Sequence, residues 1–352
     1  MVTTGEQIEE ILEPELPIID PHHHLWEWTP ALVATLPPPV HPFEKVFRRS
    51  TRYLLDELLA DLRTGHNIRA TVFVQCGAMY RADAAPAFKP VGETEFVNGI
   101  AAMTASGTYG DIRVAAGIVG HVDLTLGAVV SEVLEAHIRV GADRFRGIRH
   151  SASYDEDPKV LGPLARTPAG LYESKSFREG YAQLSKYDLS FDAWLLEPQL
   201  PELIALVSRF PQVPVILDHV GTPLGIARYE GKRDERFATW RDNIRKLAEL
   251  PNVCVKLGGL AMPFCNFPSF MQSPPAPSTQ LAREWKPFVE TCIDAFGVNR
   301  CMFESNFPVD KGSCTYPVLW NALKIIVREY SGAEKGALFS ETAKRVYRLN
   351  VR

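Results

Sequence analysis

Eight short apolar runs, each followed by a stretch with helical periodicity, constrain the fold of this chain more than any other feature. The runs are rich in β-branched residues and lie at residues 16–20, 70–75, 112–119, 145–149, 189–194, 213–218, 253–257 and 300–304. Most are apolar throughout, which is typical of strands buried on both faces of a parallel sheet. Eight strand–helix units predict an α/β fold, a closed (β/α)8 or TIM barrel, as one domain over residues 1–352.

The predicted helices alternate with these strands. They are expected at residues 53–63, 128–140, 177–187, 201–210, 237–250, 281–296 and 316–330, with a weaker pattern at 95–105 and a last helix at 334–349. Long connections rich in Pro and Gly lie at residues 30–47, 81–92, 154–174 and 262–278, after the first, second, fourth and seventh strands. These are long βα loops, so we expect them at the C-terminal face, where barrel active sites are built.

Composition narrows the class of protein. The chain has 352 residues, of which 46% are hydrophobic and 23% charged, as in soluble globular proteins. A net charge of −4 without a Lys/Arg cluster argues against a nucleic-acid partner, and the lack of an 18-residue apolar stretch argues against a membrane partner. The N-terminus carries acids where a signal peptide would carry bases, so a cytoplasmic location is predicted. A homo-oligomer is compatible with the sequence.

The segment IIDPHHHLW contains the most specific candidate site. Side chains alternate between the two faces of a strand, so His22 and His24 should point the same way as Asp20, and His23 the opposite way. Two imidazoles on one side of a strand end can ligate one metal ion. The alternative is a cluster of histidines that only caps the strand or lies at the surface.

These residues resemble a known family. The pattern D-x-H-x-H at the end of the first strand marks the amidohydrolase superfamily. The longer IIDPHHHLW is similar to the amidohydrolase-related (amidohydrolase 2) branch, which contains sugar-acid lactonases and 2-pyrone-4,6-dicarboxylate lactonase. Looser similarities in TVFVQCG, FRGIRHSAS, SFDAWLLEPQL, VILDHVGTP, VKLGGL and MFESNFPVD extend over nearly the whole chain. The resemblance implies that His219 of VILDHVGTP binds or polarises the scissile carbonyl, or assists a metal-bound water.

The resemblance also bears on metal binding. The fifth strand offers Asp192 instead of a histidine, and the fourth lacks the carboxylated lysine of binuclear members, so a binuclear centre is not expected. A single divalent ion, zinc in the first place, would be held by His22, His24 and His219. Because the pyrone lactonase branch works without metal, a metal-independent reaction stays open.

The eighth strand departs from the family pattern. Many members end this strand with Ser-Asp-x-Pro and use the Asp as general base, whereas this chain has Asn306 there. An amide cannot accept a proton at neutral pH. The base would then be Asp310, Asp192, Glu304 or His219, or the reaction is not a hydrolysis. Alternatively, Asn306 is only a turn residue.

Further residues at predicted strand ends form the candidate substrate-binding set. Arg149 could hold a substrate carboxylate bidentately, or form an ion pair with a loop acid. Gln75 could donate to a substrate oxygen or be satisfied within the core. Asp192, His150 and Trp26 complete the set, although aromatic residues near strand ends often serve for packing alone.

These observations predict an enzyme, a lactonase-like hydrolase that opens a small carboxylated cyclic ester or a related carbonyl compound. His22, His24, His219 and Asn306 form the predicted catalytic set. A decarboxylase or hydratase acting on a small acid is the first alternative, because it tolerates Asn306. A ligand-binding barrel without catalysis is the second.

Overall fold

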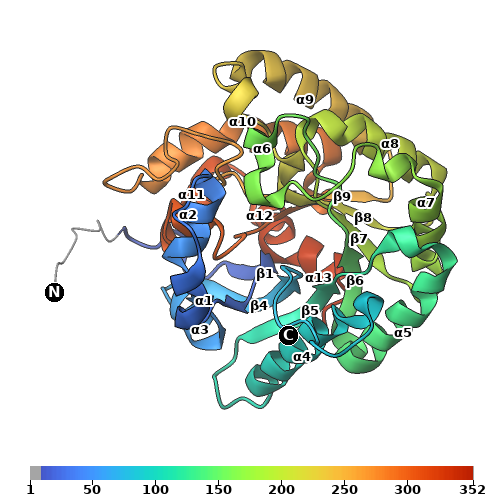
Figure 1. Cartoon of the computed structure of the whole chain (residues 1–352). Helices are drawn as coiled ribbons and strands as arrows, with labels where there is room; N and C mark the ends of the chain where they lie inside the picture. Colours follow the sequence, from blue (N-terminus) through green and yellow to red (C-terminus); the bar gives the residue numbers. More distant parts are fainter. Residues whose placement is uncertain (1–8, 352) are drawn as a thin grey trace.

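The computed structural model describes residues 9–351, and its centre is a barrel of eight parallel strands (Figure 1). In barrel order the strands are β1 (Pro17–His23), β4 (Asn67–Val74), β5 (Arg113–Gly120), β6 (Phe145–Arg149), β7 (Ser190–Ala193), β8 (Val215–Leu217), β9 (Val253–Leu257) and β10 (Cys301–Phe303). The segment after β10 pairs with β1 and closes the barrel. Asn306 N–H donates to the His22 carbonyl at 2.9 Å, and His24 N–H donates to the Phe307 carbonyl at 2.8 Å. The predicted fold is confirmed.

Helices surround the strands and cover their outer faces (Figure 1). They are α3 (Leu55–Leu62), α4 (Val91–Ala105), α5 (Val130–Gly141), α7 (Lys175–Tyr181), α8 (Leu200–Arg209), α9 (Arg233–Ala248), α10 (Ser278–Phe296) and α11 (Tyr316–Ile326). The last predicted helix is divided into α12 (Gly332–Gly336), one π-helical turn (Ala337–Glu341) and α13 (Thr342–Val346). None of the helices among residues 9–351 has the length and apolar character needed to cross a membrane.

The interior of the barrel is sealed by the C-terminal segment. Strand side chains such as Ile19, Val72 and Met302 point inward and pack with Tyr347 and Leu349 in one apolar cluster. Burial of this apolar surface is the main stabilising contribution of the barrel interior. The opposite end of the barrel is left for polar side chains.

The first long loop is more ordered than predicted. Residues 30–47 were expected to be irregular, but they contain α1 (Pro30–Thr35) and most of α2 (Pro42–Arg49). Helix α2 begins at a reciprocal cap, in which the Glu44 carboxylate accepts from His41 N–H at 2.7 Å and His41 Nδ1 accepts from Phe43 N–H at 3.1 Å. A histidine at the cap is not the usual Ser, Thr or Asp signal, so the sequence pattern missed this helix start.

Other parts of the mouth are also structured. A short ladder of β2 (Trp26–Glu27) and β3 (Arg52–Tyr53) flanks α1 and α2, and α6 (Pro158–Leu161) lies within the loop after β6. These segments cover the C-terminal end of the barrel, as expected for βα loops.

Candidate active site

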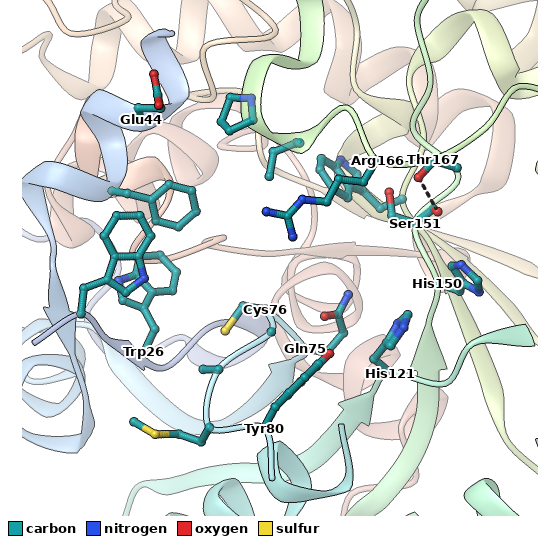
Figure 2. Close-up of a pocket in the computed structure, with 18 of the residues that line it drawn as sticks. Trp26, Glu44, Gln75, Cys76, Tyr80, His121, His150, Ser151, Arg166 and Thr167 are labelled. Atoms are coloured by element: carbon teal, nitrogen blue, oxygen red, sulfur yellow. Dashed lines mark hydrogen bonds between the residues drawn. The ribbon is translucent and has the colours of Figure 1, made fainter. Parts of the chain in front are cut away.

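A small pocket at the C-terminal mouth collects most of the predicted site residues. Its volume is about 130 Å³ and we call it the inner pocket. Its polar lining residues are His24, Gln75, Arg149, His219 and Asn306, and its apolar lining residues are Trp26, Phe43, Phe47, Cys76, Leu164, Trp194, Met262 and Val309. A larger cavity of about 1200 Å³, the outer cleft, is shown in Figure 2. It shares six of the residues of the inner pocket, among them Gln75, Leu164 and Trp194, so the two spaces adjoin.

Two imidazoles, those of His24 and His219, line the inner pocket. His24 Nδ1 lies 2.7 Å from the Val74 carbonyl, and His219 Nδ1 lies 2.7 Å from Glu304 Oε1. Both partners are acceptors, so Nδ1 donates in each ring, and Nε2 is an acceptor when the ring is neutral. Burial lowers the pKa of His24 well below its ordinary value, which keeps this ring neutral.

His22 lies behind this wall and does not line the inner pocket. Its Nδ1 is 2.8 Å from Glu304 Oε2 and 3.2 Å from Lys256 Nζ, and its Nε2 is 3.3 Å from Arg149 Nη1. Burial, reinforced by the charge of Lys256, lowers the pKa of His22 to about 4. His22 is therefore a neutral ring, and its two nitrogen atoms contact Glu304, Lys256 and Arg149 beneath the pocket.

Asn306 is held in one orientation by a buried acid. Its Nδ2 donates to Asp310 Oδ1 at 2.9 Å, and burial raises the pKa of Asp310 to about 7. Both Asn306 and His219 have positive φ angles, 55° and 56°, which cost free energy and are concentrated at functional sites in proteins. A simple turn function does not account for the burial of Asn306 and its place on the pocket wall.

Lys256 joins two carboxylates in the barrel interior. Its Nζ lies 2.6 Å from Asp192 Oδ2 and 3.0 Å from Asp218 Oδ1, and Tyr347 Oη donates to Asp192 Oδ2 at 2.7 Å. Burial raises the pKa of Asp192 to about 6. Burial would also raise the pKa of Asp218, but Lys256 and His22 hold it well below its usual range. Asp192 lines neither cavity, so the predicted contact between Asp192 and a substrate is not seen.

Arg149 lines the inner pocket as predicted, but much of its guanidinium is already paired. Nη1 donates to Asp218 Oδ2 at 3.3 Å and Nη2 donates to the Gln75 carbonyl, while Nε–H has no partner among the described residues. The ion-pair alternative is thus realised, with Asp218 of the barrel mouth in place of a loop acid. His150 lines only the outer cleft, and its Nδ1 accepts from the Leu124 N–H at 3.2 Å.

The remaining polar residues of the IIDPHHHLW motif, Asp20 and His23, contact other side chains inside the barrel. Asp20 accepts hydrogen bonds from Ser305 Oγ at 2.6 Å and Tyr316 Oη at 3.0 Å, and lines neither cavity. The prediction that Asp20 shares the orientation of His24 toward the site is wrong, because the pairing register of β1 shifts between Asp20 and His23. His23 points away from the site, as predicted, and its Nε2 contacts Thr71 Oγ1 at 2.9 Å.

Sequence reasoning named Glu304 and His219 as two of four candidate bases and missed that the two residues pair with each other. The VKLGGL segment contained a signal for this contact. A Cβ at Gly258 would collide with Glu304, and a Cβ at Gly259 would collide with the His219 ring. The two glycines therefore let the end of β9 approach the Glu304–His219 pair closely.

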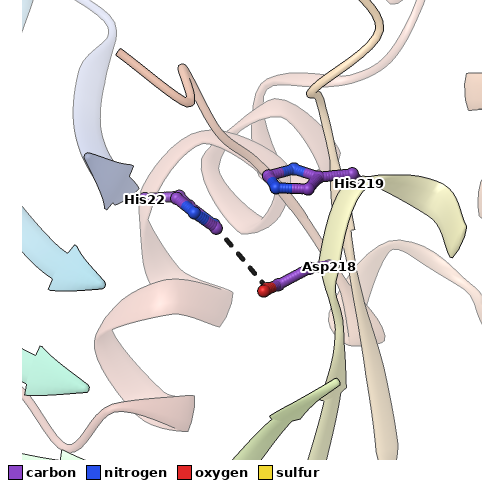
Figure 3. A group of neighbouring side chains, drawn as sticks. All are labelled: His22, Asp218 and His219. Carbon is purple, nitrogen blue, oxygen red and sulfur yellow. Dashed lines mark ion pairs between the residues drawn. The ribbon is translucent and has the colours of Figure 1, made fainter. Parts of the chain in front are cut away.

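A candidate metal group lies at the base of this arrangement. His22, Asp218 and His219 each offer one donor atom, and the three atoms lie within 4.8 Å of one another (Figure 3). Two imidazole nitrogens and one carboxylate oxygen are donors that zinc accepts, so the residues fit a divalent ion in their chemistry. His24 is not part of the group. The predicted ligand set thus differs in one member, with Asp218 in place of His24.

Comparison with known proteins assigns the family. A family model described as Amidohydrolase matches residues 19–349. The chain belongs to the amidohydrolase family. This amidohydrolase is 32% identical over 342 residues to the protein y4mH of Sinorhizobium fredii, covering 95% of this chain and 99% of that protein.

Two further relatives come from Burkholderia multivorans. An L-fucono-1,5-lactonase is 29% identical over 244 residues, covering 68% of this amidohydrolase and 73% of the relative. A crystal structure of an amidohydrolase with bound zinc has a TM-score of 0.70 at 27% identity, covering 94% of this chain and 99% of that chain. The similarity therefore extends over the barrel and the segments that carry the inner pocket.

Proposed function

We propose that this amidohydrolase hydrolyses a small cyclic ester, a lactone, in the inner pocket. The observation that carries the proposal is the Glu304–His219 pair, in which a buried carboxylate fixes an imidazole that lines the inner pocket. A similar pairing of a carboxylate with an imidazole activates nucleophiles in hydrolases of unrelated folds. The L-fucono-1,5-lactonase relative supports a lactone as the substrate class.

In this proposal His219 is the general base, a task that Asn306 cannot perform. His219 Nε2 accepts a proton from the attacking water, and Glu304 stabilises the imidazolium that forms. Burial would raise the pKa of Glu304, but His219 and His22 lower it to about 2, so this group stays a carboxylate. When the tetrahedral intermediate collapses, the imidazolium returns the proton to the ring oxygen that leaves as a hydroxyl.

One donor on a side chain that lines the inner pocket can stabilise the oxyanion. Asn306 Nδ2 uses one hydrogen for Asp310 and retains the other. Donors held in position before the reaction stabilise the charge that develops on the carbonyl oxygen. The lone pair of His24 Nε2 is an acceptor suited to orienting the water or a substrate hydroxyl.

We further propose that a single divalent ion, zinc in the first place, would be held by His22, Asp218 and His219. Such an ion would polarise the carbonyl and lower the pKa of a bound water. The zinc in the Burkholderia multivorans amidohydrolase supports this proposal. With such an ion bound, His219 Nε2 would be a metal ligand and not the base, and Glu304 at Nδ1 would orient the ligating imidazole and increase its basicity.

The proposal is tested with a panel of sugar-acid lactones, pyrone carboxylates and aromatic acids. Ring opening is followed by proton release and by the gain of one water in the product mass, with and without added zinc. We expect turnover by the wild type and a loss of turnover in His219→Asn. Release of carbon dioxide without water uptake would favour the decarboxylase alternative, and tight binding without turnover would favour a binding barrel; either result overturns the proposal.

A further inference from the structure

Arg166 is an unpaired cation at the entrance to the site. It belongs to the segment between β6 and α7, and its guanidinium projects into the middle of the outer cleft (Figure 2). In the part of the chain that the structure describes, the only hydrogen bond from Arg166 is the one that its backbone N–H donates to the Leu164 carbonyl. Resting on the proposed function, we infer that Arg166 binds an anionic arm of the lactone substrate.

Two other arginines near the same space are already engaged. The guanidinium of Arg149 is shared between Asp218 and the Gln75 carbonyl, and Arg48 donates to the carbonyls of Val33 and Pro37. Arg166 is therefore the guanidinium of the cleft that keeps its full set of donors for a ligand.

The acids that line the outer cleft do not neutralise Arg166. Glu44 accepts from the N–H groups of His41 and Val40, and Glu27 lies 3.5 Å from Arg52. Asp123 accepts from Thr125 at the start of a helical turn. Arg166 is therefore available to pair with an anion that enters the cleft, because none of the acidic side chains of the cleft is paired with it.

The position of Arg166 is set by the segment that also borders the inner pocket. Arg166 N–H donates to the Leu164 carbonyl at 2.8 Å, and Leu164 lines both cavities. Thr167 Oγ1 donates to the Ser151 carbonyl at 3.3 Å, which ties the segment to the chain just beyond β6 (Figure 2). A molecule that is bound in the inner pocket and extends past Leu164 into the outer cleft therefore meets Arg166 there.

The two cavities differ in chemistry, and this difference defines the substrate. Aromatic and aliphatic side chains such as Trp26, Phe47 and Trp194 form most of the inner wall, which suits a flat ring with few hydroxyls. Polar groups such as Tyr80 and His121 line the outer cleft together with Arg166. A cyclic ester whose carboxylate arm points outward fits both spaces, because a guanidinium binds a carboxylate through two parallel hydrogen bonds.

The test compares Arg166→Met and Arg166→Lys with wild type on a carboxylated lactone and on its neutral amide. For Arg166→Met we expect kcat/KM on the carboxylated lactone to fall about 10- to 100-fold through KM, with a much smaller change on the amide. Arg166→Lys should recover part of the loss. Arg48→Met is the matched control, because this arginine lines the same cleft but is engaged with backbone carbonyls.

Equal losses on both substrates, or a wild-type preference for the neutral amide, would overturn the inference and leave the proposed lactonase function standing. If the wild type opens no lactone, the proposed function fails instead. Calorimetry with a ring carboxylic acid then still tests Arg166, since the inference requires weaker binding to Arg166→Met than to wild type.

Discussion

Glu304 accepts two hydrogen bonds from His219, one from the backbone N–H at 3.1 Å and one from imidazole Nδ1 at 2.7 Å. The two contacts fix the backbone and the ring of His219 together, at a residue whose φ is 56°. The orientation of the proposed base therefore depends on a residue 85 positions away in the chain.

Replacing Glu304 tests the proposed base directly. Glu304→Gln keeps the size of the side chain and removes the negative charge that stabilises the imidazolium. We expect kcat for lactone opening to fall about 10²- to 10⁴-fold with little change in KM. Steady-state kinetics measure the effect, and thermal unfolding checks that the variant is folded. A variant that is folded and retains full kcat would contradict a role for Glu304 in base catalysis.

Adjacent histidines provide a matched comparison. His24 lines the inner pocket, whereas His23 is buried against Thr71 on the other side of the strand. We expect His24→Ala to abolish activity with the fold intact, and His23→Ala to lower the melting temperature while the folded fraction stays active. The reverse pattern in kinetics and calorimetry would show that the pocket lies on the other face of β1.

Asn306→Asp should lower activity. The new carboxylate would replace an amide that donates to Asp310 Oδ1 at 2.9 Å, so two acids would face each other in a buried site. The oxyanion donor is lost, and an acidic substrate is repelled. We expect a lower kcat and a higher KM for carboxylated lactones. Faster ring opening or a higher metal content of the variant would show that position 306 still serves as a base or ligand site.

Glu93 should make the stability of the protein depend on pH. Burial raises the pKa of Glu93 from 4.5 to about 7. The native state then keeps a proton that the unfolded state releases, so the free energy of unfolding falls as the pH rises from about 4.5 to about 7. The difference between these two pKa values corresponds to about 3 kcal/mol.

Glu93→Gln should flatten this part of the profile, because glutamine keeps an acceptor for the N–H groups of Cys76 and Ala78 and does not ionise. Denaturant unfolding at several pH values measures the slope for wild type and variant. Identical slopes in the two proteins would assign the pH dependence to other groups.

Lys256 is predicted to be essential for stability. It is fully buried between Asp192 and Asp218, and its removal leaves Asp192 without a cation and Asp218 with Arg149 alone. Lys256→Met should cost about 3–5 kcal/mol, and the added change Asp192→Asn should recover part of this loss. Denaturant unfolding of the single and double variants gives both values. Additive losses would show that Lys256 and Asp192 do not act as a pair.

The sequence by itself determined the architecture. Eight apolar runs placed the strands to within about three residues, because a strand buried on both faces must be apolar along its own length. The motif IIDPHHHLW located the mouth of the barrel. It also predicted that His23 and His24 point to opposite faces of the strand, since alternation along a strand is a local property.

Only the tertiary structure decided which groups meet. Glu304 and His219, Arg149 and Asp218, and Lys256 and Asp192 are brought together by closure of the barrel. Their pairing depends on strand register, which no local pattern encodes. A register shift in β1 removed Asp20 from the pocket wall, because a shift of one residue redirects a side chain to the other face. Arg166 was missed because an arginine in a loop is recognised as a binding group only once its neighbours are known to leave it unpaired.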